Sequence, residues 1–242
     1  MRRLRAVVAA LAATTALAGC GVDGVAVKAA DDVAPSSSDG PIPTQPAPTT
    51  GASGAPITAD GAFRISTSDD VRVVVTVVED MACPACKAFE AAYGDTLAEL
   101  AALPGAAVDY RVISFLDRMS DDQYSSRAAN ASYCVWNRPG DDRARQDTWR
   151  RFQVAAFRAQ PAEGGPGLSD DRLAAMAKTA GAGDVSTCIT TRQYAQDVHG
   201  TTSSTMSEPE FEGTPTLLVN GERLDLRSAA TLLDKVKGLL PG

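Results

Sequence analysis

The sequence of residues 71–86 is VRVVVTVVEDMACPAC, and it predicts a buried strand that leads into a helix. Residues 71–78 are β-branched at nearly every position, which favours a central strand covered on both faces of a sheet. From residue 86 to residue 103, apolar residues recur near the helical spacing of about 3.6, and Pro84 suits the first turn of a helix. The motif Cys83-Pro84-Ala85-Cys86 therefore lies at the junction of the predicted strand and helix.

This placement predicts redox chemistry at Cys83 and Cys86. The unpaired N–H groups and the positive dipole end of a helix start stabilise a thiolate over a thiol, at about 1.4 kcal/mol for each unit of lowered pKa. We expect Cys83, at the helix start, to be the sulfur that a client thiolate attacks, and Cys86 to lie deeper and resolve stalled intermediates. A permanent disulfide remains an alternative, and so does a zinc site, although His199 is the only histidine.

The remaining pattern predicts an α/β fold with a helical insertion. Further strands are predicted at residues 63–65, 108–116, 216–219 and 222–226, the last two joined by a tight hairpin at Asn220-Gly221. Helices are predicted at residues 121–136, 141–159, 170–180, 184–202 and 228–240, with Ser169 as an N-cap. A strand, crossover helix and parallel strand are expected around the cysteine pair. Five aromatic residues of the insertion are expected in its core: Tyr133, Trp136, Trp149, Phe152 and Phe157.

Two motifs together resemble the DsbA-like branch of the thioredoxin superfamily. One is Glu79-Asp80-Met81-Ala82-Cys83-Pro84-Ala85-Cys86, and the other is Gly213-Thr214-Pro215-Thr216-Leu217-Leu218-Val219-Asn220-Gly221. The resemblance covers residues 63–242 and implies an α/β thioredoxin fold, with a central mixed β-sheet flanked by helices and an inserted helical domain. It places the first part of the thioredoxin-like domain at residues 58–118, the insertion at 119–206 and the second part at 207–242.

The resemblance also implies site residues. Pro215, preceded by Thr214, corresponds to the cis-proline that faces the active-site cysteines in this family, and the alternative is a trans proline that begins a strand. Glu79 or Asp80 is a candidate to relay protons to Cys86 from beneath, although acidic residues at strand ends are more often solvated.

The implied function is an extracytoplasmic thiol:disulfide oxidoreductase that introduces disulfides into reduced exported client proteins. A membrane partner of the DsbB or vitamin K epoxide reductase-like kind would reoxidise it, and no cofactor or metal is expected. Ala85 stands where strongly oxidising members often carry a histidine, so we expect a less oxidising couple, and a reductase or isomerase stays open. An alternative from another class is a copper-binding or chaperone-like lipoprotein that uses the same two cysteines.

The N-terminus predicts export. Residues 1–20 combine a basic start, an apolar run and small residues, as a signal peptide does. Leu17-Ala18-Gly19-Cys20 resembles a bacterial lipobox, which implies cleavage before Cys20 and lipidation of its sulfur, so that the protein is anchored at the extracytoplasmic face of the cell membrane. An ordinary cleaved signal is the alternative. Residues 21–57 contain six of the fourteen prolines and are expected to form a disordered Pro/Ser/Thr-rich tether.

Cys134 and Cys188 are the remaining cysteines. In an oxidising compartment, two unmatched cysteines on helices of one insertion are expected to form a structural disulfide. The alternative is a second redox pair, which lacks the two-residue spacing of Cys83 and Cys86. The chain has 23 Lys and Arg against 30 Asp and Glu, a net charge of −7, and this balance argues against a nucleic-acid partner.

Overall fold

The computed structural model describes residues 57–241. The predicted signal peptide, Cys20 and the tether up to residue 56 lie outside the described residues. Within residues 57–241, no helix is both long enough and apolar enough to cross a membrane.

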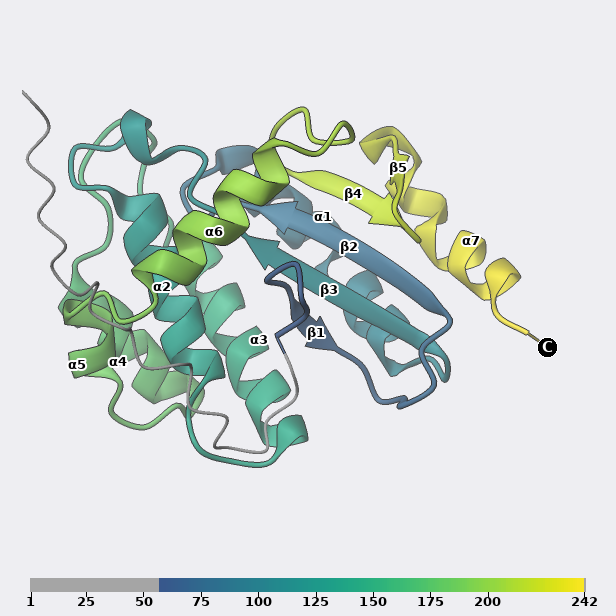
Figure 1. Cartoon of the computed structure of the whole chain (residues 1–242), viewed down its shortest axis with the longest axis horizontal. Helices are drawn as coiled ribbons and strands as arrows, with labels where there is room; N and C mark the ends of the chain where they lie inside the picture. Colours follow the sequence, from purple (N-terminus) through teal and green to yellow (C-terminus); the bar gives the residue numbers. More distant parts are fainter. Residues whose placement is uncertain (1–56, 242) are drawn as a thin grey trace, which may run out of the picture. The chain divides into compact units, whose positions relative to one another are not determined.

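A mixed sheet of five strands forms the centre of the molecule, in the order β1-β3-β2-β4-β5 (Figure 1). The strands are β1 Phe63–Ile65, β2 Val73–Glu79, β3 Ala106–Val112, β4 Thr216–Val219 and β5 Glu222–Leu224. β2 and β3 pair in parallel, as the predicted crossover requires, and the other neighbours are antiparallel. The central mixed sheet and the hairpin at Asn220-Gly221 are thus confirmed.

The strand predicted at residues 108–116 is wrong at both ends, because β3 begins at Ala106 and ends at Val112. Its partner β2 ends at Glu79, and the last bond along this pair joins Ile113 N–H to the Glu79 carbonyl at 2.9 Å. Beyond that point no neighbouring strand offers hydrogen-bond partners, so the chain leaves the sheet.

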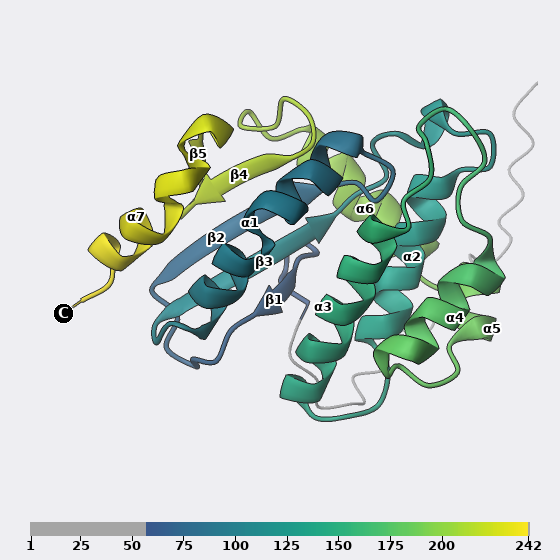
Figure 2. The same ribbon diagram turned by 180° about the vertical axis from the view of Figure 1, so that it is seen from behind.

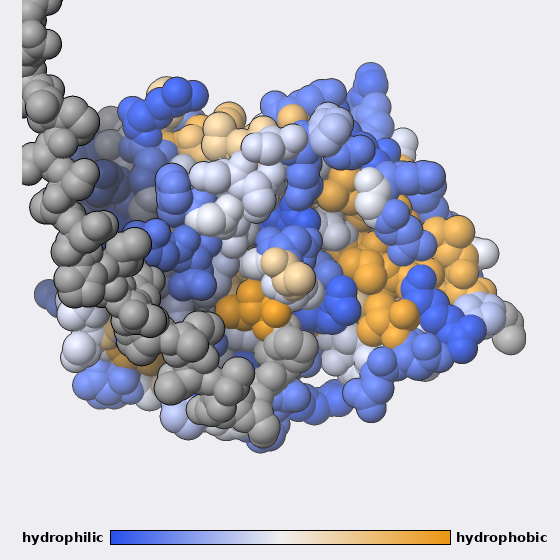
Figure 3. All heavy atoms as spheres, in the orientation of Figure 1, coloured by the Kyte–Doolittle hydropathy of each residue, from blue (hydrophilic) through white to orange (hydrophobic). Residues whose placement is uncertain are grey.

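Helices cover both faces of the sheet. α1 Pro84–Ala102 and α7 Leu232–Leu239 lie on one face, and α6 Ala195–Met206 crosses the other (Figures 1 and 2). α7 is preceded by a 3-10 helix, Leu226–Thr231, so the predicted helix at 228–240 is two elements. In the view of Figure 3, most of the surface is hydrophilic. The apolar areas on it are larger on the half that carries β4, β5 and α7.

The insertion forms a helical layer at one side of the sheet (Figure 2). It contains a 3-10 helix Asp117–Met119 and the helices α2 Tyr124–Trp136, α3 Asp142–Arg158, α4 Asp170–Ala180 and α5 Ser186–Thr190. The expected aromatic core is confirmed, because Tyr133, Trp136, Trp149, Phe152 and Phe157 are all buried. The ring of Phe63 on β1 lies 4.8–5.2 Å from three of these rings and joins the insertion to the sheet.

The single helix predicted at residues 184–202 is broken between α5 and α6. Arg192 has a positive φ of 55° at the break. The Asn130 side chain stabilises this break because its Oδ1 accepts from the Tyr194 N–H at 2.9 Å and its Nδ2 donates to the Ile189 carbonyl at 3.3 Å.

A disulfide joins Cys134 on α2 to Cys188 on α5. The two Cα atoms are 5.9 Å apart, within the range of an ordinary disulfide. The bond connects residues separated by 54 positions in the sequence, and it therefore ties α2 to α5 within the insertion.

Candidate active site

The cysteine pair lies at the start of α1. Cys83 is the N-cap residue and Pro84 occupies the first turn. The turn before the helix is closed by a bond from the Cys83 N–H to the Asp80 carbonyl at 3.0 Å. Both cysteines are free thiols, so the structure represents the reduced dithiol.

The loop before β4 lies against Cys83. Its Thr214–Pro215 peptide bond is cis. The Cys83 thiol donates a hydrogen bond to the Thr214 carbonyl oxygen, with Sγ and O 3.3 Å apart. The structure thus brings together Cys83, Cys86, Thr214 and Pro215, although 128 positions or more separate the two motifs in the sequence.

The two sulfur atoms have opposite proton affinities. The pKa of the Cys83 thiol is lowered to about 6, chiefly by a hydrogen bond from the Cys86 side chain. A hydrogen bond with the Thr214 side chain and the backbone N–H groups of Ala85 and Cys86 lower it further, while burial opposes the shift. Burial is the main cause that raises the pKa of Cys86 well above its ordinary value. The site therefore favours a Cys83 thiolate next to a Cys86 thiol.

Cys83 is more enclosed than its predicted role as the attacked sulfur suggests. Cys83 is 6% exposed and Cys86 is 0% exposed, whereas Pro84 and Ala85 between them are exposed. Among the described residues, a groove of about 440 Å³ is lined by Pro215, β4 and β5, and a small pocket of about 10 Å³ includes Ala82. Grooves of about 800 and 630 Å³ lie elsewhere, along α3. The groove beside Pro215 is therefore an opening that borders a residue of the site.

Gln160 holds the turn that carries Cys83, and sequence reasoning missed it. Its Nε2 donates to the Met81 carbonyl at 2.9 Å and to the Cys83 carbonyl at 3.0 Å. Gln160 follows α3, so the insertion directly contacts the backbone of the active-site turn. A sequence separation of more than 70 residues leaves no local signal for this contact.

Asp80 is buried rather than solvated, and its carboxylate is fully occupied. Oδ1 accepts from the Ala82 N–H at 2.8 Å and from the Ser125 hydroxyl at 2.7 Å, and Oδ2 accepts from the Leu116 N–H at 2.8 Å. Burial raises its pKa to about 6 against the effect of these bonds. Asp80 therefore fixes three segments around the active-site turn.

Glu79, the last residue of β2, is also fully buried. Its Oε1 accepts a hydrogen bond from Gln153 of α3, and its Oε2 has no hydrogen-bond partner. Burial, followed by the charge of Glu90, raises the pKa of Glu79 well above its ordinary value. The charge of Glu79 in turn contributes to the raised pKa of Cys86. Glu79, unlike Asp80, thus has a carboxyl oxygen without a hydrogen-bond partner, and its raised pKa favours the protonated form.

Within residues 57–241, no group of three or more His, Cys, Asp or Glu side chains is arranged to hold a metal ion. His199 lies on α6 and is exposed.

Comparisons with known proteins give a consistent result. Residues 68–237 match the model of a protein family described as Thioredoxin. No curated protein sequence matches the chain. Among solved structures, the chain is similar to reduced DsbA from Mycobacterium tuberculosis, with 32% identity, a TM-score of 0.64, and coverage of 75% of this chain and 93% of that one.

Two further structures extend the comparison. The reduced disulfide bond oxidoreductase DsbG from Mycobacterium tuberculosis is 32% identical, with a TM-score of 0.63 over 75% of this chain and 88% of that chain. The thiol-disulfide oxidoreductase MdbA from Corynebacterium diphtheriae is 18% identical, with a TM-score of 0.60 over 74% of this chain and 91% of that chain, and it shows the fold alone.

Proposed function

Because this chain belongs to the thioredoxin family, and within it to the DsbA-like thiol-disulfide oxidoreductases, we propose that it is an oxidase that introduces disulfides into reduced exported proteins. The observation that carries the direction is the asymmetry of the two sulfurs. A pKa of about 6 at Cys83 means that its thiolate is favoured once the disulfide is reduced. A stabilised reduced form makes the disulfide a strong donor.

The proposed reaction begins with a client thiolate that attacks the Cys83 sulfur. The Cys83–Cys86 bond breaks, a mixed disulfide forms between Cys83 and the client, and Cys86 leaves as a thiolate. Because its surroundings raise the pKa of Cys86 well above the ordinary value, this thiolate takes a proton, and Glu79 is the donor. A second client thiolate then attacks the client sulfur of the mixed disulfide and releases Cys83 as a thiolate. The client is oxidised by two electrons and the enzyme is reduced by two.

The location is proposed from the N-terminal sequence, and the partners are proposed from the family. A signal peptide at residues 1–20 with lipidation at Cys20 would hold the enzyme at the extracytoplasmic face of the cell membrane. There its partners would be reduced exported proteins and a membrane protein of the DsbB or vitamin K epoxide reductase-like type that restores the disulfide. Replacing Cys20 with Ser is expected to release the protein from the membrane fraction.

The reduction potential of the Cys83–Cys86 couple tests the proposed direction. An oxidase is expected to have a potential above about −200 mV, towards that of DsbA, and a value near the thioredoxin value of about −270 mV would instead indicate a reductase. A titration of the full-length protein with mixtures of reduced and oxidised glutathione gives this potential directly.

Variants test the roles of the two sulfurs with a reduced two-cysteine peptide as client. Cys83→Ser is expected to abolish oxidation of the client. Cys86→Ser cannot close the enzyme's own disulfide, but when Cys83 is first converted to a mixed disulfide, this variant is expected to pass that bond to the client. The double variant Cys134→Ala/Cys188→Ala is the matched control, because it removes two cysteines outside the site. Oxidation by Cys83→Ser at the wild-type rate would contradict the assignment.

A further inference from the structure

The groove of about 800 Å³ lies between α3 and α4, two helices of the insertion that pack side by side (Figure 2). Each helix turns one face to it. Arg151, Ala155 and Arg158 line it from α3 at the four- and three-residue spacing of a single helical face, and Arg172 and Met176 line it from α4 four residues apart. This α3–α4 groove is therefore a product of two regular helices and not of a loop.

The floor of the α3–α4 groove is apolar and open to water. Val154, Ala155 and Ala159 on α3 are half-buried, Met176 on α4 is buried, and Ala175 is exposed. The small alanine side chains leave the space between the helices unfilled. Covering this floor removes apolar surface from water, so the groove favours a ligand with an apolar side.

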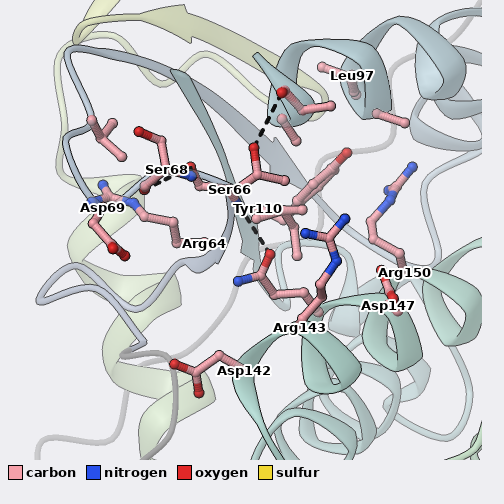
Figure 4. Close-up of a pocket in the computed structure, with 17 residues that line it drawn as sticks. Arg64, Ser66, Ser68, Asp69, Leu97, Tyr110, Asp142, Arg143, Asp147 and Arg150 are labelled. Carbon is pink, nitrogen blue, oxygen red and sulfur yellow. Dashed lines mark hydrogen bonds between the residues drawn. The ribbon is translucent and has the colours of Figure 1, made fainter. Parts of the chain in front are cut away.

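The rim of the α3–α4 groove carries one sign of charge. Its ionisable residues are Arg150, Arg151, Arg158 and Arg172, and no Asp or Glu among the described residues lines it. The groove of about 630 Å³ on the other side of α3 differs, because its arginines are accompanied by Asp69, Asp142 and Asp147 (Figure 4). The whole chain has a net charge of −7, so an entirely cationic rim is a local exception. It is complementary to a ligand that carries carboxylates beside its apolar side.

Two of the four arginines are free to bind such a ligand. Arg150 donates to Glu90 Oε2 at 3.2 Å, and Arg151 donates from Nε to the Ala180 carbonyl at 2.9 Å. Arg158 and Arg172 are exposed, and within residues 57–241 their guanidinium groups have no hydrogen bond or ion pair. A guanidinium binds a carboxylate through two parallel hydrogen bonds. Arg158 and Arg172 are therefore the available carboxylate-binding groups of this groove.

The free arginines lie towards the active site. The bond from Arg151 to Ala180, the last residue of α4, sets the end of α4 beside the middle of α3, so α4 runs back towards the end of α3. This brings Arg172 towards the end of the groove that carries Arg158. Two residues further on, Gln160 donates to the Cys83 carbonyl at 3.0 Å. The end of α3 and the start of α1 lie at the same edge of the molecule (Figure 2).

We propose that the α3–α4 groove docks an amphipathic helix of a client protein, with the apolar face of that helix on the floor and its carboxylates at Arg158 and Arg172. An open groove suits such a helix, because its other face remains in water. An acyl chain is apolar on every side and would leave one side exposed, and a flat membrane surface would not reach a concave floor. The identity of the partner as a client rests on the proposed function, whereas the docking of an acidic helix does not depend on the direction of exchange.

The size of the groove sets the length of the docked segment. The lining of α3 extends from Arg150 to Ala159, which is about 13 Å at a rise of about 1.5 Å per residue. A partner helix therefore contacts the floor over about two to three turns. A docked client would lie beside the turn that carries Cys83, so its cysteines would be held near the attacked sulfur.

A peptide without cysteine tests the docking independently of redox chemistry. The probe is a fluorescent amphipathic peptide of about 14 residues, with leucines at three- and four-residue spacing and glutamates on both flanks. Fluorescence anisotropy with the full-length protein measures its affinity. We expect the same peptide with Lys in place of every Glu, and a shuffled peptide of the same composition, to bind at least about 10-fold more weakly. Raised salt should weaken binding of the acidic peptide.

Charge reversal locates the docking site. Arg158→Glu combined with Arg172→Glu is expected to weaken binding of the acidic peptide at least about 10-fold. Arg143→Glu combined with Lys178→Glu is the matched control, because both residues are exposed on the same two helices outside the groove, and it is expected to bind as the wild type does.

Three results would overturn the docking site. They are equal affinity of the wild type for the acidic, basic and shuffled peptides, equal affinity of the Arg158→Glu/Arg172→Glu variant and the wild type for the acidic peptide, and binding of oleate or of phosphatidylglycerol vesicles without binding of the peptide. The preference of the wild type among the peptides needs no variant, so misfolding of a variant does not remove the test.

Client kinetics separate the docking site from the proposed function. A two-cysteine client extended by the acidic helix is expected to have a KM about 10-fold lower than the same client extended by the basic helix, with kcat unchanged, because docking adds binding without changing the reacting groups. Arg158→Glu/Arg172→Glu should remove this difference. Equal KM values in the wild type would overturn the docking of clients. Binding of the acidic peptide without oxidation of either client would refute the proposed function alone.

Discussion

Removing the Cys86 thiol is expected to raise the pKa of Cys83. A hydrogen bond from Cys86 is the largest of the causes that lower this pKa from 9.0 to about 6. The whole shift corresponds to about 4 kcal/mol in favour of the thiolate, an upper bound because solvent screens part of the site. In Cys86→Ala, the Thr214 contact and the helix N–H groups remain, so the pKa is expected to lie between about 6 and 9.

The assay is the rate of Cys83 alkylation by iodoacetamide as a function of pH. Wild-type protein is expected to be about 90% thiolate at neutral pH, and each unit by which the pKa rises lowers the thiolate-to-thiol ratio tenfold. Cys83→Ala is the control, because Cys86 is fully buried and is expected to stay unreactive across the same range. A midpoint of about 6 retained in Cys86→Ala would refute the reasoning and would assign the shift to the helix start alone.

Three further predictions concern stability. Replacing Cys134 and Cys188 together with Ala is expected to lower the free energy of unfolding by up to about 4 kcal/mol, measured by denaturant titration, because the bond closes a long loop. Gln160→Ala is expected to cost about 1–3 kcal/mol through two lost hydrogen bonds, and hydrogen exchange should rise at the active-site turn, while unchanged exchange would contradict its role. Burial raises the pKa of Asp80 to about 6, so this carboxyl ionises at a lower pH in the unfolded chain than in the folded protein. The free energy of unfolding of the wild type should therefore fall by up to about 3 kcal/mol as the pH rises from about 4 to 6. Asp80→Asn should remove this fall, and parallel pH profiles of the two proteins would contradict the reasoning.

The sequence predicts the parts of this protein that depend on local pattern. The strand before Cys83, the helix after it and the parallel crossover follow from β-branched and helical periodicity. The resemblance supplies the second motif around Pro215, since no local pattern brings it to Cys83. The end of β3 is mispredicted because apolar residues continue past Val112 after the pairing strand has ended.

Glu79 and Glu90, two buried carboxyl groups near Cys86, show what sequence reasoning leaves out. Glu90 has a sequence signal, because its spacing from Cys86 places both on one helix face. Arg150 and Gln153 have none, since they reach Glu90 and Glu79 across 60 and 74 positions of sequence. Tertiary packing alone decides that these charges meet, and it also decides that Glu79 and Asp80 are buried.

The bond between α2 and α5 has a consequence for how this enzyme is made. A newly synthesised copy carries thiols at Cys134 and Cys188 as well as at the motif, and only one pairing gives the insertion that supplies Gln160 to the catalytic turn. Each molecule that carries this bond has therefore itself received a disulfide of the kind that it is proposed to give to others. A cell short of oxidising capacity would then make a less stable catalyst as well as fewer oxidised products.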